Sequence, residues 1–429
     1  MRILIATPCL PWPLNCGGNA AQFSTLKCLE LDHDFTLVCP VYDETAIAEA
    51  RQLQTQLPKV KVRAIYCGHT PPPTPGLSIR IAKKVVKLGR RFLSDSQPEV
   101  QAGGEEALKY PFNPLPAKLI LALRDELSKG VDLCQAEFAE MLPLGAWLPR
   151  EIPKLFIHHQ IHFVYARRFL ETHPNDSYLS YLKAVMETQE LAYLQNFDGV
   201  VTFSDQDRQA LLAYVAPDKL FTSPFPIPAD VAIARDLPSA FDGRFLIVAS
   251  EEHAPNRDAL EWLLEGIWPE ILRQFPQAKL VVVGKWSEAA QARFAGEGVV
   301  FTGFVTDLSA TLRAGIMLVP LRIGSGIRVK ILVAMALGVP VVTTSVGSEG
   351  MLLRDGQEIL VRDTESDFAT AAVQLSRNPE LWRRLAASGK AAVFKHYSSE
   401  GVRQRRNEIY ANLARPAERV VGWQPSVLR

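Results

Sequence analysis

The most informative stretch of this chain is residues 320–340, which read PLRIGSGIRVKILVAMALGVP. The apolar run at its start predicts a strand, a glycine–serine–glycine loop follows, and the apolar spacing after the loop predicts a helix. Gly338 is expected just beyond that helix, because glycine accepts the left-handed conformation that commonly ends helices. The start of a helix presents unpaired N–H groups to an anion, and Gly324, Ser325 and Gly326 let a ligand approach the backbone closely. The stretch therefore predicts an anion site.

Arg328 and Lys330 place two positive charges in the first turn of this predicted helix. Cations at a helix N-terminus oppose the helix dipole, so a bound anion would relieve them. The alternative is a plain strand–turn–helix whose cations are solvated. A dinucleotide fingerprint is disfavoured, because Val329 stands where the third glycine of that motif belongs, so a nicotinamide dehydrogenase is the weakest alternative.

Length and composition limit the class of protein. At about 150 residues per domain, 429 residues predict two or three domains. A hydrophobic content of 48% with 22% charged residues is typical of a folded globular protein. The net charge of +1 gives no overall field for nucleic acid, so no such partner is expected. No apolar run reaches the roughly 20 residues of a membrane-spanning helix. The six cysteines form no Cys-x-x-Cys pair, which favours a reducing cytoplasm over a zinc site or disulfides.

Short β-rich runs alternate with helical patterns along the chain, which predicts parallel sheets covered by helices. Strands are expected at residues 3–7, 35–39, 62–66, 155–158 and 199–203, and again at 245–250, 280–284, 299–302, 316–320 and 340–343. The proline-rich segment 223–229 divides them, so we predict an N-terminal domain of residues 1–222 and a C-terminal domain of residues 223–399. The fold class is then α/β, with two Rossmann-like domains that face each other across a ligand-binding cleft.

Other loops are expected at the same cleft. Gly17 and Gly18 lie in the loop after the first strand and would let a bound molecule approach closely. The loop 343–350 would present its backbone N–H groups or the Glu349 carboxylate, although a simple turn explains it equally well. Asn256 is expected to cap a helix with an apolar stripe.

His158, His159 and His162 follow a predicted strand, where imidazoles can hydrogen-bond a substrate or carry protons. For any one of them a structural role is an equal alternative. No zinc site is predicted, because no adjacent glutamate completes the zinc-protease pattern. The pair Asp32 and Asp34 has the spacing that holds a divalent metal in some transferases, but it lies at the wrong end of the sheet and is interpreted as a turn.

Residues 80–92 carry six cations and no acid, with an apolar stripe at helical spacing. Such a helix can lie on an anionic membrane surface. The alternative is a helix that packs on its own domain and exposes a solvated basic face.

The second half of the chain resembles a known family. His253-x-Pro-Asn256, the run 324–331, Gly338-Val-Pro-Val-Val342 and Gly347-Ser-Glu-Gly350 resemble motifs of the GT-B-fold glycosyltransferases of the large retaining group called family four or "group 1". The resemblance implies that the C-terminal domain binds a nucleotide diphosphosugar as co-substrate, with no further cofactor, and that the N-terminal domain binds the acceptor. It also implies that a last helix, at about 400–413 within a terminal segment 400–429, packs back on the first domain.

The resemblance also assigns roles to individual residues. His159 would lie beside the reacting sugar, with His158 as the alternative one position earlier, and Lys330 would face the sugar diphosphate. Both His159 and Lys330 are thus candidate catalytic residues, and Gly17 and Gly18 are candidate acceptor-binding residues. The candidate donor-binding residues are Gly324, Ser325, Gly326, Arg328, Lys330, Ser348, Glu349 and Gly350.

Two departures from the family pattern keep other functions open. Ser325 and Val333 stand where the family usually has two glutamates, the second of which holds the nucleotide ribose. Glu251 and Glu252 lie where many members have a basic residue. The sequence predicts a retaining, metal-independent glycosyltransferase that moves a sugar to a glycan or lipid-linked acceptor. The alternatives are a glycosyltransferase-like scaffold that has lost catalysis and a nucleotide-sugar epimerase.

Overall fold

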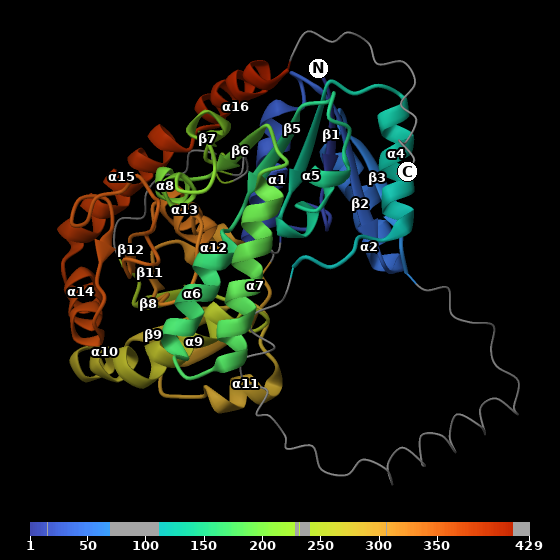
Figure 1. The fold of residues 1–429 in the computed structure, drawn as a ribbon. Coiled ribbons are helices and arrows are strands. Elements are labelled where there is room, and N and C mark those ends of the chain that lie inside the picture. Colours follow the sequence, from blue (N-terminus) through green and yellow to red (C-terminus); the bar gives the residue numbers. More distant parts are fainter. Residues whose placement is uncertain (15, 69–110, 228–230, 232–240, 306, 415–429) are drawn as a thin grey trace, which may run out of the picture.

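The computed structural model describes residues 1–14, 16–68, 111–227, 231, 241–305 and 307–414. These residues form two parallel sheets of seven and six strands, each covered by helices (Figure 1). The structure therefore confirms the predicted α/β class with two Rossmann-like domains. The basic segment 80–92 lies outside the described residues, so the prediction for it is not addressed.

The N-terminal sheet has the strand order β3-β2-β1-β4-β5-β6-β7, with every neighbouring pair parallel. Its strands are β1 (Arg2–Ala6), β2 (Asp34–Val41), β3 (Lys61–Tyr66), β4 (Leu133–Glu137), β5 (Lys154–His158), β6 (Gly199–Thr202) and β7 (Leu220–Thr222). Its helices are α1 (Gly17–Leu29), α2 (Glu44–Gln56), α4 (Ala117–Ser128), α5 (Leu144–Trp147), α6 (His162–Thr172), α7 (Ser177–Leu194) and α8 (Asp205–Leu211). Alternate residues of β1 enter different cores, Ile3 and Ile5 on one face and Leu4 on the other, which is why the strand is apolar throughout.

The C-terminal sheet has the order β10-β9-β8-β11-β12-β13 and is also parallel. Its strands are β8 (Arg244–Val248), β9 (Lys279–Val283), β10 (Val299–Gly303), β11 (Ile316–Val319), β12 (Val341–Thr343) and β13 (Leu360–Val361). Its helices are α9 (Ala254–Trp262), α10 (Trp268–Gln274), α11 (Glu288–Arg293), α12 (Leu308–Leu312), α13 (Val329–Ala336), α14 (Glu365–Arg377) and α15 (Pro379–His396).

Helix α16 (Ser399–Leu413) leaves the C-terminal domain and packs on the N-terminal one beside α1 (Figure 1). Arg403 of α16 forms an ion pair with Asp32, and the Asn407 amide donates to the same carboxylate at 2.8 Å. Asp32 lies in the turn between α1 and β2, as predicted, and its carboxylate is engaged by α16.

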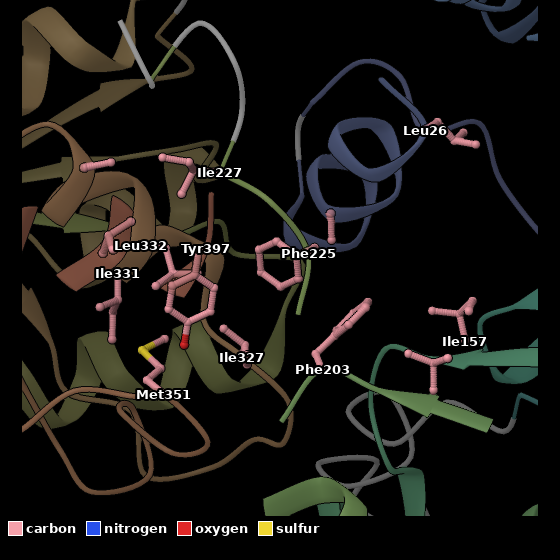
Figure 2. Packing of buried hydrophobic residues seen from close by; sticks show 14 of the residues in the cluster. Leu26, Ile157, Phe203, Phe225, Ile227, Ile327, Ile331, Leu332, Met351 and Tyr397 are labelled. Carbon is pink, nitrogen blue, oxygen red and sulfur yellow. The ribbon is translucent and has the colours of Figure 1, made fainter. Parts of the chain in front are cut away.

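One apolar cluster joins the two domains (Figure 2). Phe203, after β6, and Phe225, after β7, pack edge to face at 5.1 Å, and the cluster continues through Ile327 and Ile331 to Tyr397. Residues 223–227 are buried beside this cluster, and the division at residue 222 stays a prediction.

Several sequence expectations are wrong in detail. Strands β4, β7 and β13 were not predicted. The first of these contains buried Gln135 and Glu137, which interrupt the apolar pattern, and β7 and β13 are only three and two residues long. Asn256 does not cap a helix: α9 begins two residues earlier, and the Asn256 amide donates instead to the Ser250 carbonyl at 3.0 Å.

Two searches of the described ranges gave negative results. No three histidine, cysteine or acidic side chains among the described residues lie close enough to hold a metal ion. None of the helices in the described ranges is both long enough and apolar enough to cross a membrane.

Candidate functional site

The loops at the carboxyl ends of the two sheets meet one another. The Ser325 hydroxyl, after β11, donates to the carbonyl of Ile161 after β5 at 3.2 Å. A Cβ on Gly326 would lie 2.7 Å from the carbonyl oxygen of His159, so only glycine fits there without a shift. The predicted cleft is thus closed at this point by direct contacts between the domains. The hollow beside Lys330 is too narrow to hold a water molecule.

Arg328 occupies the N-cap position of α13 and turns back on its own loop. Its guanidinium donates to the carbonyls of Ser325 and Gly326 and, at 3.3 Å, to the carbonyl of Val346. Desolvation by the surrounding protein lowers the pKa of Arg328 to about 10, although the nearby Glu349 carboxylate opposes the shift.

Lys330 lies in the first turn of α13, as predicted. Its amine donates to the carbonyl of Val248 at 2.6 Å and to the side-chain oxygen of Asn256 at 2.9 Å. Desolvation, followed by the charge of Arg328, lowers the pKa of Lys330 to about 7. Within the described part of the chain, neither cation forms an ion pair, and both keep some solvent exposure. Two desolvated cations at one helix N-terminus make a strong attraction for an anion.

The loop 343–350 is held by the N-terminal domain. Arg168 of α6 forms a two-pronged ion pair with Glu349 and also donates to the carbonyl of Gly324. The Gln206 amide donates to Glu349 at 2.6 Å and accepts from the Gly350 N–H at 3.1 Å. One arginine thereby contacts both loops of the C-terminal domain.

Ser348 belongs to the turn itself. Its hydroxyl donates to the carbonyl of Thr344 at 3.1 Å, and its N–H donates to the same carbonyl at 3.0 Å. The structure thus brings the loop residues predicted to bind a donor to one place, next to the loop that follows β5.

His159 follows β5 and has a fixed environment. Its Nε2 lies 2.8 Å from the Glu137 carboxylate, and its ring stacks on Phe138 at 3.9 Å and meets Phe203 edge to face at 5.0 Å. Burial alone would raise the pKa of Glu137, but the hydrogen bond and charge of His159 outweigh it, so the pKa is lowered overall. An ionised carboxylate only accepts hydrogen bonds, so Nε2 of His159 carries the proton.

His158 and His162 occupy a different place, beside Glu190 of α7. His158 Nε2 lies 3.1 Å from the Glu190 carboxylate. That carboxylate also accepts the backbone N–H groups of His162 and Phe163, at 3.0 and 2.9 Å, and so caps the start of α6. His158 therefore belongs to a buried structural contact with Glu190, whereas the backbone carbonyl of His159 meets Gly326 of the other domain.

Gly17 and Gly18 are the first residues of α1 rather than part of a loop, which corrects the sequence expectation. A Cβ on Gly17 would lie 3.1 Å from a methyl of Val329, and one on Gly18 would lie 2.8 Å from the Phe138 ring and 3.9 Å from His159 Nδ1. The missing side chains let the N-terminus of α1 approach both α13 and His159. Two helix N-termini therefore meet at the site.

The two departures from the family pattern also have defined places. Val333 is buried in α13, one turn after Lys330. The Glu251 carboxylate accepts from the N–H and hydroxyl of Ser287, at 2.6 and 3.1 Å, so it is engaged at the start of α11.

Sequence reasoning missed Glu137, Arg168 and Gln206. Glu137 ends a strand whose polar residues hid it, and Arg168 contacts Gly324 only through the fold, 156 positions away. One signal could have indicated Glu137: it is a polar residue at the carboxyl end of β4, the strand before β5 in the chain. The carboxyl ends of parallel strands lie at one edge of the sheet, so Glu137 could have been expected near His159.

Residues 243–378 match the family model described as Glycosyl transferases group 1. A Klebsiella pneumoniae protein described as "Uncharacterized 44.6 kDa protein in cps region" is 23% identical over 420 residues, which is 93% of this chain and 97% of that protein.

Two solved structures share the fold. TarM of S. aureus gives a TM-score of 0.63 at 12% identity, covering 95% of this chain and 99% of TarM. HepE of Anabaena gives a TM-score of 0.64 at 13% identity, covering 96% of this chain and 100% of HepE. The comparisons support a glycosyltransferase with the GT-B fold.

Proposed function

We propose that this protein is a retaining, metal-independent glycosyltransferase that moves a sugar from a nucleotide diphosphosugar to a glycan or lipid-linked acceptor. The observation that carries the proposal is the pair Arg328 and Lys330, two desolvated cations held only by neutral oxygens among the described residues. A diphosphate would give both side chains the anionic partner that they lack among the described residues.

The leaving diphosphate gains negative charge as the bond between its oxygen and the anomeric carbon of the sugar breaks. Lys330, Arg328 and the N–H groups at the start of α13 would stabilise that charge, because they are already oriented before the reaction begins. His159 would orient the sugar from the other domain, and Gly17 and Gly18 would border the acceptor. Entry of the donor requires the contacts of Ser325 and Gly326 with the N-terminal domain to part.

The relatives support the choice of ligands. The TarM structure contains UDP, Fondaparinux and alpha-GlcNAc-glycerol, and the HepE structure contains UDP-glucose. By analogy, a uridine diphosphosugar is the first donor to test, with guanosine and adenosine diphosphosugars beside it.

Calorimetry with this panel of donors is the deciding experiment. Binding of one donor, followed by transfer to an acceptor with the anomeric configuration kept, supports the proposal, and activity that survives EDTA supports metal independence. Binding of none of the donors favours a scaffold that has lost catalysis, the alternative motivated by Val333. Sugar conversion without any acceptor identifies an epimerase.

We also place the activity in the cytoplasm, with reversible contact between the segment 80–92 and an anionic membrane face. Co-sedimentation with vesicles should then increase with the content of anionic lipid. Reversal of charge at Lys83, Lys84 and Lys87 should abolish co-sedimentation. Co-sedimentation that depends neither on the content of anionic lipid nor on these three charges contradicts this placement.

A further inference from the structure

We propose that Glu137, Gln135 and Tyr410 form a hydrogen-bonded relay that positions the imidazole of His159. The inference rests on the proposed function, in which His159 borders the reacting sugar. The three residues act through His159 and are therefore positioning residues.

The relay is continuous from the meeting point of the domains to helix α16. His159 Nε2 lies 2.8 Å from one oxygen of Glu137, and the Gln135 amide donates to the other oxygen at 2.6 Å. The Tyr410 hydroxyl donates to the side-chain oxygen of Gln135 at 2.8 Å. Each carboxylate oxygen of Glu137 thus has a partner.

The sheet explains how the side chains line up. Gln135 and Glu137 are two residues apart on β4, so both point to the same face of the central strand. On that face α16 supplies Tyr410, which is itself 1% exposed. Buried polar side chains in the middle of a sheet weaken the core unless every member is satisfied, and here the chain of donors and acceptors is complete from Tyr410 to His159.

The hydrogen bonds of the relay all point in one direction, from Tyr410 through Gln135 to Glu137. Burial raises the pKa of Tyr410, so its hydroxyl remains protonated and donates. The Gln135 oxygen accepts from Tyr410, so its amide nitrogen is oriented to donate to Glu137. The Glu137 carboxylate can only accept, so Nε2 of His159 carries a proton. Nδ1 of His159 is buried, has no hydrogen-bond partner among the described residues, and would lie 3.9 Å from a Cβ placed on Gly18, so it is the ring nitrogen that the relay leaves unpaired.

Packing fixes the plane of the same ring. Phe138 stacks on the imidazole with an interplanar angle of 15°, and Phe203 meets it edge to face at 82°. The aromatic rings fix the plane of the imidazole but not its rotation by 180° about the Cβ–Cγ bond. The hydrogen bond from Nε2 to Glu137 fixes that rotation and so determines where Nδ1 lies.

Arg406 lies one turn before Tyr410 on α16. Its side chain is 1% exposed, and none of its three nitrogens has a hydrogen-bond partner in the described ranges. A buried cation without a paired carboxylate is unfavourable for stability. The charge of Arg406 lowers the pKa of Glu137, after the larger effects of the His159 hydrogen bond and charge.

The first test is steady-state kinetics with the donor found by calorimetry. Glu137→Gln should lower kcat about 100-fold and Tyr410→Phe about 3- to 10-fold, while KM for the donor stays within about twofold, since neither residue contacts the donor. Tyr397→Phe is a matched control, because it also removes the hydroxyl of a buried tyrosine. That hydroxyl accepts from the Leu352 N–H, and both residues lie in the C-terminal domain. Asn407→Ala is a second control, because it removes a different contact between α16 and the N-terminal domain.

Wild-type kcat in a folded Tyr410→Phe protein and a folded Glu137→Gln protein overturns the relay. Equal loss of kcat in the two controls also overturns it, because the effect is then one of general packing. If Glu137→Gln does not fold, Tyr410→Phe alone decides between these outcomes.

The second test does not depend on turnover. In protein labelled with ¹⁵N-histidine, the His159 signal is assigned from its loss in His159→Gln, and a pH series shows which nitrogen of the neutral ring carries the proton. We expect Nε2 in the wild type and a mixture of tautomers in Glu137→Leu. A wild-type proton on Nδ1 overturns the relay. If the expected tautomer is found in a protein that transfers no sugar, the relay stands and the proposed function fails.

Discussion

The pKa of Lys330 makes donor binding a proton-linked event. Its value of about 7 comes from desolvation and from Arg328 beside it. A bound diphosphate would favour the charged amine and raise that pKa towards the ordinary value near 10.4. Binding therefore takes up a proton whenever the pH lies between the two values.

The magnitude follows from the titration of a single group. At about pH 8 roughly one-tenth of the free protein has Lys330 charged, so binding should take up about 0.9 proton. Because the free pKa is lower than the bound one, affinity falls as pH rises above 7, by roughly tenfold per unit. Below about pH 6 the amine is charged in both states, and the dependence disappears.

The assay is calorimetry of a nucleoside diphosphate in buffers that differ in ionisation enthalpy. The slope of apparent enthalpy against buffer enthalpy gives the number of protons taken up. Lys330→Met keeps the length of the side chain and should remove both the proton uptake and most of the affinity. Lys279→Met is the matched control, since Lys279 is exposed at the start of β9, the opposite end of that sheet. Proton uptake that persists in Lys330→Met refutes the reasoning.

Three further changes have defined outcomes. In a double-mutant cycle of Arg168→Gln and Glu349→Gln, denaturant unfolding should show a coupling energy of about 1–3 kcal/mol, because this ion pair joins the domains where little solvent reaches it; additivity would contradict the contact. Gly18→Ala places a methyl 2.8 Å from the Phe138 ring, which stacks on His159, so kcat should fall about tenfold or more. Gly296→Ala, whose methyl would meet only a Val299 methyl at 3.6 Å, should have no effect; equal effects of the two would count against the packing. Val333→Glu should tighten nucleotide binding by roughly 10- to 100-fold if the ribose lies beside α13, since one charged hydrogen bond contributes about 1.5–3 kcal/mol; unchanged affinity in calorimetry would place the ribose elsewhere.

Sequence alone predicts the parts of the site that are local. The strand, the Gly324–Gly326 loop, the first-turn Lys330 and the end of α13 before Gly338 follow from spacing, because each depends on residues within a few positions. Gly338 indeed has a φ of 73°. The predicted strands of both sheets follow for the same reason, since fully buried parallel strands read as apolar runs.

The parts that depend on distant residues escape such reasoning. Gln135 and Glu137 break the apolar pattern of β4, and they are tolerated only because Tyr410, 275 positions from Gln135, completes their hydrogen bonds. Arg168 reads as one of two adjacent surface arginines until the fold brings Glu349 to it, 181 positions later. No local pattern encodes either partner.

The central claim is that the start of α13 cradles a diphosphate. A crystal structure of the protein with a non-hydrolysable nucleotide diphosphosugar tests it most directly. We predict phosphate oxygens at about 2.7–3.2 Å from Lys330 Nζ and from the backbone N–H groups that open α13. A diphosphate bound with Lys330 still held by Val248 and Asn256, and with no oxygen near α13, would contradict the account.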